Sequence, residues 1–495
     1  MPLLGQWAAR QPGKAAAIFV DTGETLSFAQ LDARADLAAR WLVSRGLQPG
    51  DGVALLLENQ PDFLVMSYGA KRAGLMVTPL SIHLRPHEVA YVLADSGARL
   101  LVTAPALAGL ADALPPGVPR LTTDEARAAA AATPAAALPA HPVGREFLYS
   151  SGTTGLPKGI RRPLIPHENR LAPEFDMTWK DFYGFDDRTV YLSPAPLYHA
   201  APNRYVQRVI DHGGTAVITR KFNPEQCLAL IAAHRVTHSQ WVPTMFVRLL
   251  ALPAAVRGAH DLSSHRCAIH AAAPCPVAVK QAMIDWWGPI LREYYAGSEG
   301  IGVCIIDSAD WLRHPGSVGR PAYGAVHILD DDGAPLPPGE VGRIWFEGGA
   351  RFAYHNAPEK TAEAYNERGW ATLHDLGHVD RDGFLYLSDR RADLILSGGV
   401  NVYPAEIEAA LAEHPLVADV GVIGVADADF GERPLAVVVP REGLSAADLL
   451  DFARTRLAGP KLPRGVEFVD ELPRSEAGKL LRRLLKQRFR VTPPG

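Results

Sequence analysis

Residues 149–159, YSSGTTGLPKG, combine small hydroxyl side chains, three glycines and one lysine in a short stretch. Glycines let backbone N–H groups approach an anion closely, and Ser and Thr hydroxyls add further donors. The lysine adds a mobile positive charge. This composition predicts a phosphate-binding loop. A flexible surface loop is the alternative, but the rigid end formed by Pro157-Lys158-Gly159 argues against it.

Two familiar phosphate motifs do not fit this loop. A Walker A motif needs Gly-Lys at the position where the chain has Pro157-Lys158. The dinucleotide fingerprint G-x-G-x-x-G also fails, because no glycine lies between Gly152 and Gly155. If residues 149–159 bind phosphate, they therefore do so as a loop of a different class.

The composition is that of an ordinary globular protein with more than one domain. The chain has 495 residues, 47% hydrophobic and 21% charged, and one hydrophobic core rarely serves so long a chain. Its 50 basic and 54 acidic residues give a net charge of −4 without a basic block, which argues against nucleic acid as a partner. The apolar patch at the N-terminus is too short for a signal peptide, and no run reaches membrane-spanning length. We therefore expect a cytoplasmic protein without a transmembrane segment.

Cysteine and histidine spacing predicts neither disulfides nor a metal centre. The four cysteines are Cys227, Cys267, Cys275 and Cys304. They include no C-x-x-C pair, so we expect reduced thiols that mostly pack in the core. His374 and His378 are four residues apart, which on a helix could share a metal, but the pattern around them predicts a strand, a turn and a strand.

The first half of the chain alternates predicted strands and helices. Residues 16–20, AAIFV, are typical of a strand, and Ser27 with Gln30 forms a capping box that begins a helix running toward Gly46. The run GVALLL then predicts another strand, and the alternation repeats at spacings typical of parallel crossovers. We expect a large layered α/β domain with helices on both faces of its sheets.

Two segments interrupt this alternation. Residues 104–142 are rich in Ala and Pro, and the interspersed prolines favour a surface excursion over a helix. Near residue 390 the pattern changes, and about a hundred residues follow with their own helices and strands, enough for a small domain. We predict an N-terminal domain at 1–389, a hinge at 390–392 and a C-terminal domain at 393–495.

Several motifs stand in a characteristic order along the chain: YSSGTTGLPKG, PLYHAAPN, AAAPCP, YYAGSEG, LHDLGHVDRDGFLYLSDR, SGGVNVYPAEIE and RSEAGKLLR. In this order they resemble the signatures of the adenylate-forming superfamily, which includes acyl-CoA synthetases, beetle luciferases and nonribosomal peptide synthetase adenylation domains. The motifs run from Tyr149 to Arg482, and the strand–helix alternation upstream also fits, so the likeness covers nearly the whole chain. It implies a large N-terminal α/β domain, which binds ATP and the acyl group, and a smaller mobile α+β C-terminal domain.

The resemblance assigns Lys479 as the catalytic lysine that bridges the carboxylate and the α-phosphate. Bringing two anions together requires positive charge at the point of reaction; taken alone, Lys479 would be a solvated lysine at the start of a basic helix. The loop is implied to hold the β- and γ-phosphates, with Thr154 also counted as catalytic. Its residues are Ser150, Ser151, Gly152, Thr153, Thr154, Gly155 and Lys158.

Four more residues are implied to act on the nucleotide. Glu299 matches the glutamate that holds Mg²⁺, a hard cation suited to carboxylate oxygens; a surface carboxylate is the alternative. Ser298 stands where the family often has threonine and is implied to hydrogen-bond the acyl carboxylate or the α-phosphate. Asp375 resembles the aspartate that accepts both ribose hydroxyls, and Arg390 is expected near ribose or phosphate.

The resemblance also implies an adenine slot and an acyl pocket. The slot would be lined by residues 271–274, with Tyr295 stacking on the base; many family members have glycines where Ala271 and Ala272 stand. His199 would be the gate of the acyl pocket, although a lone histidine is more often structural. The slot residues are Ala271, Ala272, Ala273 and Pro274. The pocket residues are His199, Ala200, Trp241, Ala271, Ala296 and Gly297.

Rotation of the small domain is implied to let one site serve two half-reactions. It would withdraw Lys479 and bring Gly398 and Gly399 to line the tunnel for the pantetheine arm. Ala392 stands at the hinge position where the family usually has Asp or Lys. Alanine permits rotation, but it cannot make a charged contact that favours one orientation.

We therefore expect an ATP-dependent acid–CoA ligase that uses ATP, Mg²⁺ and CoA. Small residues around the acyl pocket favour a medium- or long-chain or bulky apolar carboxylic acid. One alternative is a stand-alone adenylation enzyme that loads a carrier protein; an alternative of another class is a non-catalytic nucleotide-binding regulator. Homodimers are common in the family.

Overall fold

The computed structural model describes every residue except 1, 112–113, 116, 151–156, 170–177, 391–392, 398–399, 428–430, 458, 476–477 and 490–495. The chain divides into two compact units. The first unit comprises Met1–Trp241, Leu252–Ala268 and Arg351–Glu363, and the second comprises Val242–Ala251, Ile269–Ala350 and Ala364–Gly495. Within the described residues, no helix is long and apolar enough to cross a membrane.

The first unit contains two sheets built mainly from parallel strands. One has the strand order β4-β3-β5-β6, with bounds Met76–Pro79, Gly52–Leu56, Ala98–Thr103 and Arg120–Thr122. The other has the order β2-β1-β10-β9-β11, with bounds Glu24–Ser27, Ala15–Phe19, Thr215–Ile218, Val190–Ser193 and His238–Trp241. Strand β3 is buried along its whole length, as expected in a parallel sheet that is covered on both faces. The α/β fold class predicted from the sequence is confirmed.

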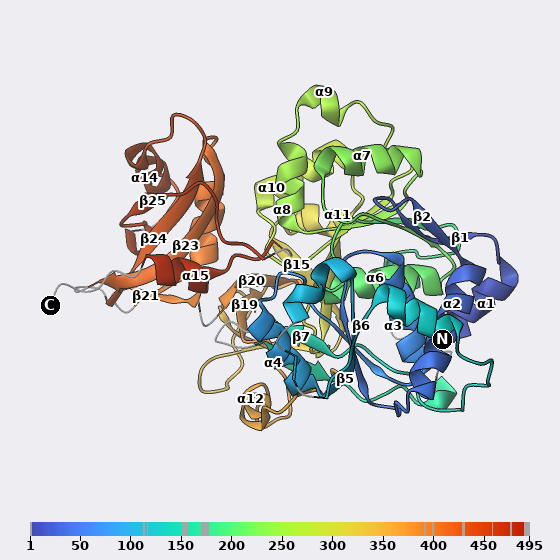
Figure 1. The fold of residues 1–495 in the computed structure, drawn as a ribbon. Helices are drawn as coiled ribbons and strands as arrows, with labels where there is room; N and C mark the ends of the chain where they lie inside the picture. Colours follow the sequence, from blue (N-terminus) through green and yellow to red (C-terminus); the bar gives the residue numbers. More distant parts are fainter. Residues whose placement is uncertain are drawn as a thin grey trace. The chain divides into compact units, whose positions relative to one another are not determined.

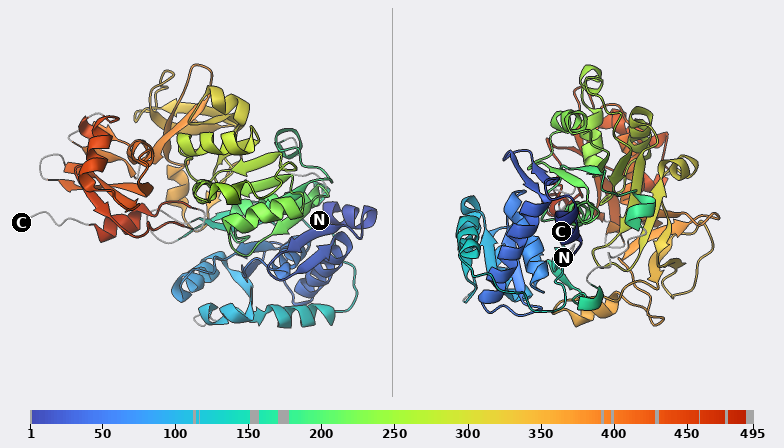
Figure 2. Two further views of the ribbon diagram at one scale, coloured as in Figure 1. Left: turned by 90° about the horizontal axis from the view of Figure 1, so that it is seen from above. Right: turned by 90° about the vertical axis from the view of Figure 1, so that its right-hand side faces the viewer.

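Helices α2 (Phe28–Ser44) and α3 (Pro61–Arg72) pack against each other, and the blue helices lie side by side in Figure 2. The predicted capping box begins α2: Ser27 Oγ accepts from Gln30 N at 3.2 Å, and Gln30 Oε1 accepts from Ser27 N at 2.8 Å. The other α-helices of this unit are α1 (Pro2–Arg10), α4 (Pro86–Ser96), α5 (Thr123–Ala131), α6 (Ala200–Asp211), α7 (Pro224–Ala233), α9 (Ala254–Arg257) and α12 (Pro358–Glu363).

The prediction of a surface excursion without helix at 104–142 was wrong for part of that segment. It contains a short 3₁₀ helix at Pro105–Ala111, strand β6 and helix α5. The prolines flank α5 and do not interrupt it. Thr122 caps the helix, because its Oγ accepts from Glu125 N while Glu125 Oε2 accepts from Thr122 N at 2.7 Å.

In the second unit the strands between residues 291 and 390 pair antiparallel with one another. The order is β13-β14-β15-β20-β19-β17-β16, with bounds Leu291–Ala296, Val303–Asp307, Ser317–Tyr323, Leu385–Arg390, Asp375–Val379, Gly342–Glu347 and Ala325–Leu329. Helices α8 (Pro243–Leu250), α10 (Val277–Trp287) and α11 (Ser308–Arg313) accompany them. Strands β19 and β20 confirm the strand, turn and strand predicted around His374 and His378.

The C-terminal part of the second unit has its own sheet with helices on both faces (Figure 1). Its strand order is β22-β21-β24-β23, with β25 beside β24. The strands are Val400–Val402, Ile395–Ser397, Gly431–Pro440, Val417–Asp427 and Val466–Phe468; the helices are α13 (Pro404–Ala412), α14 (Ala446–Arg454) and α15 (Arg482–Arg488). Alternate residues face two apolar clusters: Val420 and Val422 lie in the cluster with α13 and α14, and Ile423 and Val425 in the one with α15. This sheet carries the segment that contains Lys479.

A buried charged network joins α3 to α6. Lys71 of α3 forms an ion pair with Glu146 and donates to Gln207 Oε1 at 2.8 Å, and Arg204 Nε lies 3.9 Å from Glu146 Oε2. Burial alone would raise the pKa of the Glu146 carboxyl, but the Lys71 and Arg204 charges hold the pKa well below its usual range. The network therefore fixes α6, the helix that begins directly after His199.

Replacing Lys71 with Met should destabilise the first unit by about 3–5 kcal/mol, because it leaves Glu146 as a buried carboxylate that has lost its main partner. Urea denaturation measures the loss. The matched control is Arg456→Met, which breaks the exposed Arg456–Glu413 pair at 2.9 Å and should cost less than about 1 kcal/mol. Equal losses in the two variants would contradict a structural role for the network.

Candidate active site

The predicted phosphate loop connects two antiparallel strands. Strand β7 (Leu148–Ser150) pairs with β8 (Lys158–Arg161) in a register that sets Ser150 opposite Lys158. Lys158 Nζ lies 5.0 Å from the centre of the Tyr354 ring, in a cation–π contact. The strands thus fix both ends of the loop, whereas the predicted phosphate ligands from Ser151 to Gly155 lie outside the described residues.

Gly159 has a packing function that the composition of residues 149–159 did not reveal. A Cβ there would lie 2.9 Å from ring atoms of both Phe147 and Tyr149. Tyr149 is fixed in turn, because its hydroxyl donates to Asp95 Oδ2 at 2.6 Å; burial, followed by this carboxylate, raises the pKa of the phenol. The glycine that ends the motif therefore serves the aromatic packing beneath the loop.

A tight turn between β13 and β14 presents Ser298 and Glu299. Gly300 N donates to Gly297 O at 3.1 Å, which closes the turn around these two residues. A Cβ on Gly297 would lie 2.6 Å from Glu299 Oε2 and 2.5 Å from Leu373 Cδ2. The absence of a side chain at Gly297 makes room for the Glu299 carboxylate, in addition to any role in the acyl pocket.

A hydrogen bond joins two of the predicted nucleotide residues. The Tyr295 hydroxyl donates to Asp375 Oδ2 at 2.7 Å, and the Tyr295 ring lies 6.1 Å from that of Phe346 in a tilted arrangement. Asp375 begins β19, where its backbone is paired with Arg390 of β20; the Arg390 side chain lies outside the described atoms. The second unit therefore joins Tyr295 to Asp375, and Ser298 and Glu299 follow in the turn directly after the strand that carries Tyr295.

The predicted adenine slot follows β12 (Cys267–His270) and contains an unusual backbone conformation. Ala272 has φ +78°, in the left-handed region that favours glycine. Ala271 is buried and Ala272 is exposed. Ala272 therefore carries backbone strain, a consequence that the sequence alone did not indicate.

A buried polar group beneath this slot was missed in the sequence. Lys280 Nζ donates to Glu293 Oε2 at 2.5 Å, and His270 Nε2 lies 3.7 Å from the same oxygen. Burial, followed by the Lys280 charge, lowers the pKa of His270 well below its usual value, so the imidazole is neutral at physiological pH. His270 directly precedes Ala271, and Glu293 lies two residues before Tyr295, so this group supports the slot from below.

The acyl-pocket residues of the first unit are less clearly placed for a ligand. His199 is the N-cap residue of α6, and its ring packs edge-on against Tyr198 at 4.9 Å. Trp241 is 1% exposed, and its indole N–H donates to Ser239 Oγ at 2.6 Å. Trp241 therefore packs as a core residue, and its contribution to a pocket stays a prediction, as do those of His199 and Ala200.

In the C-terminal part, Lys479 follows Gly478, which has φ +74°. Three residues further on, Arg482 donates to both Glu408 oxygens at 2.8 and 2.7 Å and to Asp393 Oδ2 at 3.3 Å. These bonds tie residue 393 to α13 and α15. The predicted hinge residue Ala392 and the tunnel residues Gly398 and Gly399 lie outside the described residues.

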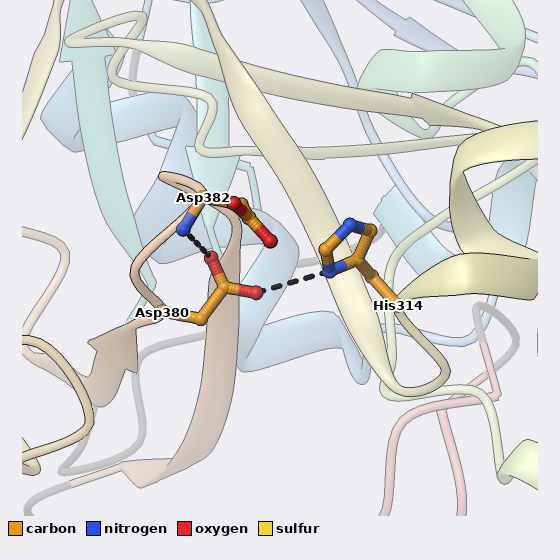
Figure 3. A group of neighbouring side chains, drawn as sticks. All are labelled: His314, Asp380 and Asp382. Carbon is orange, nitrogen blue, oxygen red and sulfur yellow. Dashed lines mark hydrogen bonds and ion pairs between the residues drawn. The ribbon is translucent and has the colours of Figure 1, made fainter.

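One group of side chains in the described part of the chain has the spacing of a metal site: His314, Asp380 and Asp382 (Figure 3). Asp380 is already occupied, because Oδ1 accepts from the backbone N–H groups of Asp382 and Phe384, and Oδ2 accepts from Tyr386 Oη. The His314 ring stacks on Phe384 with centroids 3.8 Å apart. These contacts account for Asp380 and Asp382 as residues of the turn between β19 and β20, and for His314, which follows α11 (Ser308–Arg313), as a side chain packed against that turn.

Known proteins with similar sequences and structures cover nearly the whole chain. Residues 4–353 match the family described as AMP-binding enzyme, and residues 406–479 match the AMP-binding enzyme C-terminal domain. The chain is 35% identical to a feruloyl-CoA synthase from Amycolatopsis over 98% of this chain and 99% of that protein. It is 33% identical to the fatty acid–[acyl-carrier-protein] ligase ScoC from Streptomyces coeruleorubidus, over 94% and 92%. The crystal structure of ATP-bound MatB from Rhodopseudomonas palustris aligns with a TM-score of 0.86 and 31% identity, over 98% of each chain.

Replacing Ala272 with Gly should stabilise the protein by about 0.5–1 kcal/mol, because relief of the positive φ outweighs the extra entropy of the unfolded chain. Urea denaturation measures the change. Ala273→Gly is the matched control, since Ala273 is not among the residues with positive φ, and it should be destabilising. Destabilisation by Ala272→Gly as well would contradict the inferred strain.

Proposed function

This chain belongs to the AMP-forming acid–CoA ligases of the adenylate-forming superfamily, and we propose that it activates a bulky apolar or medium- to long-chain carboxylic acid. In the first step a carboxylate oxygen bonds to the α-phosphorus of ATP and pyrophosphate leaves. In the second step the CoA thiol attacks the acyl carbon, and AMP leaves with both electrons of the broken C–O bond. The products are acyl-CoA, AMP and pyrophosphate.

The observation that carries the proposal is the Tyr295–Asp375 hydrogen bond beside the Glu299 turn. A carboxylate can accept from two ribose hydroxyls at once. The aromatic ring next to it offers a face on which a base can stack. Asp375 and Tyr295 would thus orient the nucleoside, with the Lys280–Glu293 pair as a support beneath the slot.

Glu299 is suited to hold Mg²⁺. Its carboxylate is half-buried in a turn where Gly297 leaves room beside it, and a hard cation prefers such oxygen ligands. When bound, Mg²⁺ would neutralise charge on the phosphates. Lys479 would neutralise the negative charge that develops between the carboxylate and the α-phosphate. Repulsion between these two anions opposes their reaction, so a positive group at this point lowers the barrier.

The substrate class is inferred from small side chains. Ala200 and Ala201 begin α6, and in the second unit Ala272 and Gly297 also have a small side chain or none. Small side chains at the positions that the resemblance assigns to the acyl pocket suit a large apolar acid, which agrees with the feruloyl and fatty-acid names of two relatives. A clear preference for acetate would contradict this part of the proposal.

A carrier protein is the second candidate for the acyl acceptor, because one relative at 33% identity is named as a ligase for acyl-carrier protein. A non-catalytic nucleotide-binding regulator is disfavoured, since both Lys479 and Glu299 are present.

Mass spectrometry of the products tests the proposal. The protein is incubated with ATP, Mg²⁺ and a panel of aromatic, short-, medium- and long-chain acids, with and without CoA. We expect acyl-CoA and AMP from apolar acids only when CoA is present. Acyl-AMP that accumulates and ignores CoA would support the carrier protein as acceptor, and the absence of any acid-dependent AMP would overturn the proposal.

A further inference from the structure

Lys479 lies in a short hairpin whose two arms are hydrogen-bonded. Arg474 and Leu480 form an isolated antiparallel bridge, and Leu481 N donates to Pro473 O at 2.8 Å. Leu480 packs onto β23, where a Cβ on Gly421 would lie 2.7 Å from Leu480 Cδ2. The arms of the hairpin are therefore fixed to the sheet.

The backbone of Lys479 is held on both sides by Ser475. Lys479 N donates to Ser475 Oγ at 3.2 Å, and Ser475 N donates to Lys479 O at 2.8 Å. The peptide group between Gly478 and Lys479 is planar, so fixing its carbonyl oxygen as well fixes the whole plane. That carbonyl oxygen accepts from Arg474 Nη1 at 2.9 Å.

Asp419 of β23 holds the Arg474 guanidinium in place. Arg474 Nε donates to Asp419 Oδ2 at 2.8 Å, and Nη2 donates to Oδ1 at 2.7 Å. This two-point contact orients the guanidinium plane and directs Nη1 at the Gly478 carbonyl. A lysine could not do both, since its ammonium is a single point on a flexible stem.

We propose that Arg474, oriented by Asp419, is a positioning residue that sets the direction of Lys479 for the adenylation half-reaction. This inference rests on the proposed function, in which Lys479 acts on the carboxylate and the α-phosphate. Arg474 touches neither reactant in this account. It acts through the peptide plane that precedes Lys479.

The test compares the two half-reactions in Arg474→Met. Acid-dependent ATP–pyrophosphate exchange should fall by about 10- to 100-fold, because a small displacement of a catalytic group has effects of that size. Thioester formation from supplied acyl-AMP should stay within about twofold of wild type, since a loss confined to one half-reaction marks an interaction used only there. In a Lys479→Ala background, the same substitution should cause no further loss of exchange.

Equal loss of both half-reactions in Arg474→Met would overturn the proposal. So would a double variant, Arg474→Met with Lys479→Ala, whose exchange activity falls by the product of the two single losses. Arg456→Met, in the exposed pair with Glu413, is the matched control and should leave both half-reactions unchanged. If Arg474→Met does not fold, Asp419→Asn decides by the same criteria, because it keeps the arginine and removes only the charge that orients it.

The wild-type protein separates this inference from the proposed function. If the wild type shows no acid-dependent exchange with any acid, the proposed function fails. If the wild type exchanges and Arg474→Met exchanges equally well, only the positioning role fails.

Discussion

Repulsion between two anions is the constraint on which the site depends, because a carboxylate must reach the α-phosphorus of a nucleotide that is itself strongly negative. We propose that the protein meets this constraint with two positive groups, Lys158 and Lys479, whose backbones are fixed before reaction. Lys158 lies at the end of a β-hairpin loop. Lys479 lies in a hairpin held by Ser475 and Arg474. Fixing these charges in advance avoids reorganisation during the reaction.

The C-terminal sheet links the hairpin that contains Lys479 to the predicted hinge. Arg474 and Asp419 tie the hairpin to β23, and Arg482 ties residue 393, just after the hinge, to Glu408 of α13. One apolar cluster on each face of the sheet packs the helices against it. A rotation about the predicted hinge, residues 390–392, would therefore move Lys479 together with this sheet. Ala392 has no charge with which to favour either orientation.

Local patterns in the sequence predicted much of this fold, and long-range contacts account for what they missed. The capping box at Ser27 was predictable, because its two partners are three residues apart, and the motifs named Tyr295 and Asp375, whose side chains form a hydrogen bond. Helix α5 was missed because the prolines around it outweighed its own capping box. The strain at Ala272 depends on φ. The Lys280–Glu293 and Asp419–Arg474 pairs join residues 13 and 55 positions apart in sequence, beyond the three- or four-residue spacing of a helical pattern.

Isotope transfer from the acid tests the central claim, attack of the carboxylate on the α-phosphorus, most directly. The acid is labelled with ¹⁸O in its carboxylate, the reaction runs with ATP and CoA, and the nucleotide and phosphate products are analysed by mass spectrometry. Because AMP leaves with the oxygen that formed the bond to phosphorus, the label should appear in AMP and not in pyrophosphate. Label in inorganic phosphate, together with ADP, would contradict the account, since it requires attack at the γ-phosphorus.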